Sequence, residues 1–120
     1  MNPTGNTIRE IILSDEFSGY YDSLSAKARD KYAYAMQIIM TQKTVSEKFV
    51  KKILNTEFYE VRVSVGTNEY RTILIAVDKP NFIEATRAVF LNSFLKKGNN
   101  QYKREIEKAR TVMKREKILL

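Results

Sequence analysis

The segments that decide the fold of this chain read FYEVRV (58–63), EYRTILI (69–75) and VFLNSFLKK (89–97). All three are rich in β-branched and aromatic residues, the composition typical of strands. Each also carries a basic residue at a fixed place, namely Arg62, Arg71 and Lys96. Charged side chains are rarely buried without a partner, so a sheet that holds three of them needs a reason. An anionic ligand on one face of the sheet would supply that reason.

The pattern within these runs predicts a hairpin beside a central strand. Between residues 58 and 65, period-two alternation separates an apolar face from a polar one. The apolar face holds Tyr59, Val61, Val63 and Val65, and the polar face holds Glu60, Arg62 and Ser64. The connector Gly66-Thr67-Asn68 is a hairpin signal. Residues 70–77 are apolar on both faces apart from two positions, which predicts a central strand.

The residues before the hairpin predict one strand and two helices. The β-branched run 7–13 suits a first strand, and Ser14 is a helix N-cap signal. A break at 23–25 separates two helices, which we expect to form an antiparallel helical hairpin. Their aromatic stripe, with Phe17 and Tyr32, is interpreted as core rather than as a ligand site. Residues 44–56 are interpreted as a short turn of helix that leads into the sheet.

The residues after the hairpin predict a turn, a strand and a last helix. Asp78-Lys79-Pro80-Asn81 is a turn signal, and 82–87 are interpreted as an extended hairpin tip. A strand at 88–95 then leads to a helix whose shared face carries Tyr102, Ile106, Ala109 and Met113. The expected fold is one α+β domain over residues 1–120. It has a small, twisted, antiparallel-rich sheet, an N-terminal helical hairpin and a C-terminal helix, with the helices on one side.

Composition narrows the chemistry that the chain can perform. It has no cysteine and no histidine, which excludes disulfides, thiolate chemistry and imidazole catalysis. No carboxylate cluster is spaced to hold a metal and no glycine-rich phosphate loop is present, so neither metal nor cofactor is expected. The net charge of +7 favours an anionic partner. No apolar run reaches the ~20 residues of a membrane span and residues 1–6 are polar, so we expect a cytoplasmic protein without membrane contact.

Nearly all of the net charge lies between Lys96 and Lys117. This stretch holds nine basic and three acidic residues, as expected for a surface that binds phosphates. Beyond position 105 the charges are interpreted instead as a solvated helix face, with ion pairs from Glu107 to Lys103 and to Arg110.

One reaction that needs neither histidine nor metal fits these residues, namely cleavage of RNA by its own 2′-OH. The substrate supplies the nucleophile, and guanidinium and ammonium groups stabilise the charge of the phosphorane-like transition state. Arginine suits bidentate contact with phosphate, and lysine suits a point charge near the leaving group. RNA is therefore the leading candidate for the ligand.

Several short motifs keep an order and spacing known from one family. They are FVKKIL (49–54), FYEVR (58–62), EYR (69–71), FLKK (94–97) and a later Glu105-Ile106 with Ala109. Together, across residues 17–109, they resemble the RelE/HigB superfamily of type II toxin–antitoxin toxins, in its phage-derived-protein-like branch. The chain departs from that pattern after its Lys-Lys pair, where it has Gly98-Asn99-Asn100-Gln101, and in a longer hairpin at 80–87.

The resemblance implies a compact ribonuclease fold and ribosome-dependent cleavage of mRNA in the A site, by a toxin that a partner antitoxin, often a helix-turn-helix protein, inhibits. It implies that Arg62 and Arg71 contact the scissile phosphate, and that Lys96 is a proton donor or electrostatic stabiliser. Glu60 could act as a base, but is interpreted as the group that orients an arginine. The residues implied to bind mRNA or ribosomal RNA are Lys51, Lys52, Phe94, Lys97, Lys103 and Arg104, of which Phe94 either stacks on a base or simply packs.

Two other interpretations stay open. The ParE branch shares the fold but poisons DNA gyrase, and a protein-binding toxin would not need the basic residues Arg62, Arg71 and Lys96. A non-catalytic binding module of mobile-element origin would instead use Arg62 and Arg71 in ion pairs with Glu60 and Glu69. The metal-independent endoribonuclease is the favoured prediction.

Overall fold

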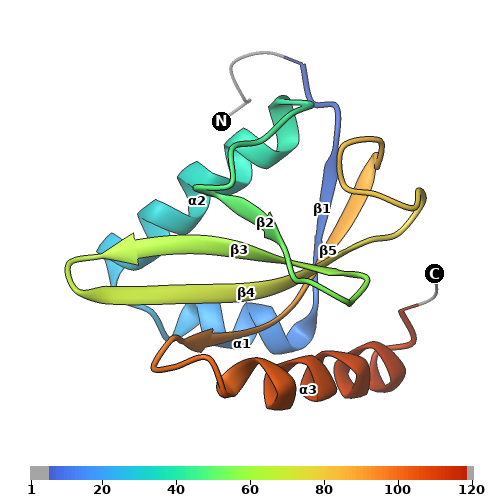
Figure 1. The fold of residues 1–120 in the computed structure, drawn as a ribbon. Coiled ribbons are helices and arrows are strands. Elements are labelled where there is room, and N and C mark those ends of the chain that lie inside the picture. The colour runs from blue at the N-terminus through green and yellow to red at the C-terminus, as the bar shows by residue number, and fades with distance from the viewer. Residues whose placement is uncertain (1–5, 119–120) are drawn as a thin grey trace.

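The computed structural model describes residues 6–118 and contains a five-stranded sheet with helices on both faces (Figure 1). The elements follow in the order β1 (Glu10–Leu13), α1 (Asp15–Asp22), α2 (Ala26–Thr41), β2 (Val50–Lys52), β3 (Phe58–Val65), β4 (Asn68–Ala76), β5 (Arg87–Leu95) and α3 (Gln101–Arg115). The strand order is β1-β5-β4-β3-β2, with β1 parallel to β5 and the other neighbours antiparallel. The predicted α+β class, N-terminal helix pair and C-terminal helix are confirmed.

Two expectations concern the membrane and the start of the chain. No helix within residues 6–118 is long and apolar enough to cross a membrane. Residues 1–5, most of the polar start, lie outside the described part of the chain.

The predicted hairpin forms between β3 and β4 with a two-residue connection. Val65 faces Asn68 across the turn, and Gly66 has a φ of +60°. A positive φ at the first central residue is what a type II′ turn requires, and glycine adopts it without a steric penalty. As predicted, β4 lies in the centre of the sheet, between β3 and β5.

Gly66→Ala is expected to lower the free energy of unfolding by about 1 kcal/mol, because a side chain at this φ is strained even where space is free. Gly19→Ala is the matched control, since Gly19 lies inside α1 with open space around it. There the same change should stabilise by about 0.5–1 kcal/mol. Urea unfolding measures both, and effects of the same sign would contradict the turn geometry.

The helices cover both faces of the sheet, so the expectation that they lie on one side is wrong. The core on one face joins α1 and α2 to the sheet through Phe17, Tyr32 and Ile39. On the opposite face, Ala109 and Val112 of α3 pack against β4 and β5. These two strands carry apolar side chains on both faces, and each apolar face needs its own cover.

The aromatic stripe on α1 and α2 is core, as predicted. Phe17 and Tyr32 are fully buried. The Tyr32 hydroxyl lies 2.8 Å from Thr72 Oγ1, which in turn lies 2.6 Å from Ser93 Oγ. Burial raises the pKa of Tyr32, so its hydroxyl stays protonated and its hydrogen bond intact. Ser14 caps α1 as predicted, with its Oγ accepting from the Phe17 amide at 2.9 Å.

The prediction of a short helical turn over 44–56 holds only near Ser46, where the Val50 amide donates to the Ser46 carbonyl at 3.1 Å, and is wrong for the rest of the range. A turn at 47–49 leads instead into the short strand β2. Val50 faces Val61 and is buried. The backbone N–H and C=O groups along the outer edge of β3 need hydrogen-bond partners, and pairing with β2 supplies partners for part of them.

Arg9, just before β1, joins three segments of the chain. It is only 1% exposed, and its guanidinium lies 4.1 Å from the ring centroid of Phe82. It donates hydrogen bonds to the backbone carbonyls of Ile39, Gln42, Lys43, Ile83 and Ala85. These acceptors belong to the end of α2, the residues after it and the loop before β5. Burial lowers the pKa of Arg9, and the charge of Asp78 opposes that shift.

Candidate active site

The sheet face that α3 partly covers brings the three predicted catalytic residues together. Arg62 of β3 and Arg71 of β4 are direct partners in the antiparallel register, so they lie on the same face. Lys96 follows β5, and its amide donates to the carbonyl oxygen of Glu69 at 2.7 Å. The Lys96 ammonium lies 5.8 Å from the ring centroid of Tyr102, a residue of α3.

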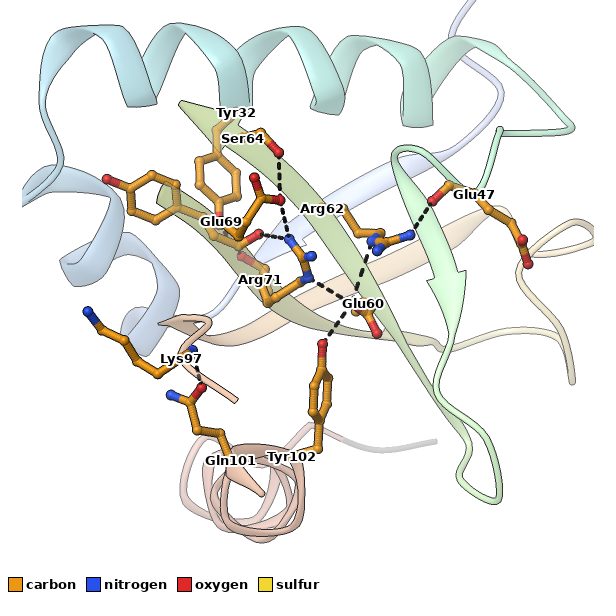
Figure 2. A network of polar contacts seen from close by, with 12 residues as sticks. Tyr32, Glu47, Glu60, Arg62, Ser64, Glu69, Arg71, Lys97, Gln101 and Tyr102 are labelled. Atoms are coloured by element: carbon orange, nitrogen blue, oxygen red, sulfur yellow. Dashed lines mark hydrogen bonds and ion pairs between the residues drawn. The ribbon is translucent and has the colours of Figure 1, made fainter. Parts of the chain in front are cut away.

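One carboxylate oxygen organises this group (Figure 2). Glu60 Oε1 lies 2.9 Å from Arg71 Nε and 3.7 Å from Arg62 Nε. It also accepts a hydrogen bond of 3.0 Å from the Tyr102 hydroxyl. The Arg71 contact is an ion pair that lacks hydrogen-bond alignment. A carboxylate oxygen with three partners suits an orienting group better than a free base.

The two arginines differ in what a ligand could reach. The Arg71 side chain is 4% exposed, and its Nη1 donates to the Tyr70 carbonyl at 3.0 Å and lies 3.5 Å from Glu69. The Arg62 side chain is 31% exposed. Its Nη1 donates to the backbone carbonyl of Glu47 at 3.2 Å, while the Glu47 carboxylate points away (Figure 2). Arg62 is therefore the accessible guanidinium, and Arg71 is held beneath the surface.

Tyr102 is the member of the cluster that sequence reasoning missed. The helical pattern placed it on the apolar face of the last helix, where it does belong to the core beside α3. Burial, the charge of Glu60 and the hydrogen bond to it raise the pKa of Tyr102. A tyrosine on a helix face that packs against a sheet needs a partner for its hydroxyl. This need for a hydroxyl partner was the one sequence feature that could have indicated Tyr102 as a member of the cluster.

Tyr102→Phe is expected to lower the free energy of unfolding at pH 7 by about 1–2 kcal/mol, because Glu60 loses a hydrogen bond. Because the pKa of Tyr102 is raised in the folded state, its hydroxyl contributes its full stabilisation below about pH 10. This stabilisation is lost as the pH rises through the folded-state pKa. The gap between wild type and variant in urea unfolding should therefore shrink at alkaline pH. A gap that stays constant to pH 11 would contradict the role of the hydroxyl, and Tyr34→Phe on the exposed side of α2 is the control.

The predicted RNA-binding lysines of β2 are separated by the sheet. Lys51 pairs with Glu60, whereas Lys52 pairs with Tyr59. Paired residues share a face, so Lys51 lies on the face of the cluster and Lys52 on the opposite one. There the Lys52 ammonium lies 5.0 Å from the ring centroid of Tyr59.

The remaining predicted RNA-binding residues also differ in placement. Phe94 is 6% exposed and meets the Tyr102 ring edge to face at 5.5 Å, which matches packing rather than base stacking. The Lys97 side chain is exposed and extends away from Glu60 (Figure 2). Lys103 and Arg104 are exposed in the first turn of α3.

The departure at 98–101 has a structural role. Gln101 Oε1 accepts hydrogen bonds from the amides of Lys97 and Gly98, and its Nε2 donates to the Leu95 carbonyl at 3.1 Å. One side chain thus fixes the turn that carries the chain from Lys96 to Tyr102.

Three basic residues of α3, Lys108, Arg110 and Arg115, pair with carboxylates outside the helix, and the predicted Glu107 ion pairs are wrong. Arg110 forms a bidentate pair with Glu57 at 2.7 and 3.0 Å. Glu16 of α1 pairs with Lys108 at 3.2 Å and with Arg115 at 3.0 Å. Packing of α3 on the sheet brings these carboxylates within reach. Lys97, Lys103 and Arg104 take part in none of these pairs and are exposed.

The chemistry of the cluster is electrostatic. Within residues 6–118, no three side chains of the types that hold metals are grouped to do so. The Arg62 guanidinium and the Lys96 ammonium can stabilise negative charge that develops on a bound phosphate, and the ammonium can donate a proton.

A family model described as Phage derived protein Gp49-like (DUF891) matches residues 20–114. Curated proteins and solved structures gave no significant match. The matched range runs from α1 to α3 and includes every member of the Glu60 cluster. That family is associated with toxin–antitoxin systems. This chain belongs to the phage-derived Gp49-like family.

Proposed function

We propose that this protein is the toxin of a type II toxin–antitoxin system of the RelE/HigB kind. It is a metal-independent endoribonuclease that cleaves mRNA on cytoplasmic ribosomes, and a partner antitoxin, of the helix-turn-helix type, neutralises it. The observation that carries this function is the gathering of Arg62, Arg71 and Lys96 around Glu60 Oε1 and Tyr102. Membership of a family associated with toxin–antitoxin systems supports it.

The reaction is an internal transesterification of RNA. The 2′-oxygen attacks the adjacent phosphorus, the bond from phosphorus to the 5′-oxygen breaks, and a 2′,3′-cyclic phosphate forms. Arg62 contacts the non-bridging oxygens, where negative charge grows in the transition state. The Lys96 ammonium donates a proton to the departing 5′-oxygen, and the 2′-OH proton passes to water.

Arg71 acts through Glu60 rather than by contact. Its buried guanidinium lies against Glu60 and Glu69, and it thereby fixes the carboxylate that orients Arg62 and Tyr102. Preorganised donors of this kind cost no reorganisation during the reaction. The exposed residues Lys51, Lys97, Lys103 and Arg104 bind flanking phosphates of mRNA or ribosomal RNA.

The test is induction of the wild-type protein and of Arg62→Ala in a bacterial host, with mRNA 5′ ends mapped by primer extension. Growth arrest with new codon-phased ends, both lost in a variant that folds, is the expected result. Arrest without new ends would contradict the ribonuclease and favour gyrase poisoning. No arrest would contradict any toxin.

A non-catalytic binding module is the second candidate, and one observation favours it. All the ion pairs that this alternative requires are present, from Arg62 to Glu60 and from Arg71 to both Glu60 and Glu69. In such a module the arginines complete the sheet rather than serve a substrate. The exposure of Arg62 and its long 3.7 Å ion pair favour the enzyme.

A further inference from the structure

A recess adjoins the Glu60 cluster on the other side of Arg62. It is a cavity of about 180 Å³ between α2, the turn at 47–49 and the edge of β3. Its lining includes Lys31 and Tyr34 of α2, Lys48 and Phe49 of the turn, and Arg62 of β3. The pairing of β2 stops at Val50. The edge of β3 beyond Arg62 therefore has no neighbouring strand within residues 6–118.

The side chains of this Tyr34 recess combine an exposed ring with cations. Tyr34 is 61% exposed, and its ring centroid lies 6.0 Å from that of Phe49. The Lys48 ammonium lies 5.9 Å from the Phe49 centroid. Lys31, Lys48 and Arg62 line the cavity, and no carboxylate residue among residues 6–118 does. A single exposed aromatic residue would need no explanation, but an aromatic ring among cations is the composition of single-stranded nucleic-acid sites.

We propose that the Tyr34 recess binds one unpaired nucleotide of the RNA strand, next to the phosphate that is cleaved. This inference rests on the proposed function, because it takes RNA as the ligand and Arg62 as the contact of the scissile phosphate. The base stacks on the Tyr34 ring, and Lys31 and Lys48 meet the neighbouring phosphate. The unpaired edge of β3 presents backbone donors and acceptors to the edge of the base.

Size favours one unit of a longer chain, and placement favours a nucleotide over a protein segment. The recess is smaller than the ~300–1,000 Å³ of sites that enclose a whole drug-sized ligand, so it suits one unit of a longer chain. Arg62 belongs both to the lining of the recess and to the Glu60 cluster. A strand whose phosphate lies at Arg62 therefore reaches the recess with its adjacent unit.

The test is titration of the ¹⁵N-labelled full chain with an uncleavable 2′-O-methyl RNA hexamer, with affinities from fluorescence anisotropy. The RNA should shift the amides of residues 31–35 and 47–49. Tyr34→Ala should weaken binding about tenfold, the size of one lost stacking contact, whereas Tyr34→Phe should stay within about twofold. Leu54→Ala, 80% exposed and outside the recess, should bind as wild type does.

Two matched lysine substitutions on α2 control for the general effect of positive charge on RNA binding. Lys31 lines the recess, whereas Lys27, one turn earlier, does not. Lys31→Ala should weaken binding of the hexamer clearly more than Lys27→Ala, although both remove one exposed positive charge. Equal losses would show that only the general field of the protein attracts RNA, and would overturn the site.

Three further outcomes would also overturn it. They are the absence of RNA-induced shifts at the recess, equal affinities of Tyr34→Ala and Leu54→Ala, and a 12-residue polyglutamate peptide that shifts the same amides as strongly as RNA. The last would assign the recess to an acidic protein partner. The proposed function can fail separately. Wild-type protein that cuts no mRNA but shows these RNA-induced shifts would contradict the proposed enzyme activity and still support the nucleotide-binding site.

Discussion

Arg9→Met is expected to lower the free energy of unfolding by about 4 kcal/mol or more. Methionine retains much of the apolar length but donates no hydrogen bond, so five backbone carbonyls lose their donor. Each buried acceptor left without a partner costs ~1–3 kcal/mol, reduced where water can enter. The cation–π attraction to the Phe82 ring is lost as well.

Urea unfolding followed by circular dichroism measures this effect. Arg9→Lys should fall between wild type and Arg9→Met, because one ammonium keeps the charge but cannot reach all five carbonyls. Arg87→Met, at an exposed arginine, should change stability by less than ~0.5 kcal/mol. A loss below 1 kcal/mol for Arg9→Met would contradict the view that Arg9 holds α2, β1 and the loop before β5 together.

Arg62→Ala is expected to slow ribosome-dependent mRNA cleavage by about 10²–10³-fold, the cost of removing one preorganised donor to the transition state. Stability should change little, because the side chain is 31% exposed and its ion pair with Glu60 is long. Cleavage of a defined mRNA by purified protein on programmed ribosomes gives the rate. Arg62→Lys should recover part of it, since lysine keeps the charge and loses the bidentate contact.

The controls separate catalysis from folding. Arg87→Ala removes an exposed arginine at the opposite end of β5 from Lys96 and should cleave as wild type does. Arg71→Ala is unsuitable, because it leaves Glu60 and Glu69 without their buried partner and should destabilise the fold by about 3–5 kcal/mol. Wild-type cleavage by a folded Arg62→Ala protein would contradict the role of Arg62.

The fold was predictable from sequence where its signals are local. The hairpin follows from the alternation in 58–65 and from Gly66, and α1 follows from its Ser14 cap. Errors arose where an element depends on a distant partner. Strand β2 is three residues long and exists because it pairs with β3. The burial of Arg9 requires three segments that no local pattern brings together.

The same distinction applies to the candidate site. Alternation places Glu60 and Arg62 on one face, and the hairpin register then adds Arg71. Tyr102 lies 42 residues from Glu60 in the chain, so their hydrogen bond depends on how α3 packs on the sheet. That packing also buries Phe94 and Arg71. It leaves Arg62 as the accessible member of a pair that looked equivalent in the sequence.

The central claim is that the RNA's own 2′-OH is the nucleophile. The most direct test uses purified protein and ribosomes programmed with a short mRNA, either unmodified or with a 2′-O-methyl group at the cleaved nucleotide. We predict that the unmodified mRNA yields a 2′,3′-cyclic phosphate and a 5′-hydroxyl, and that the modified mRNA stays intact. Cleavage of the modified mRNA, or products that carry a 5′-phosphate, would contradict the claim.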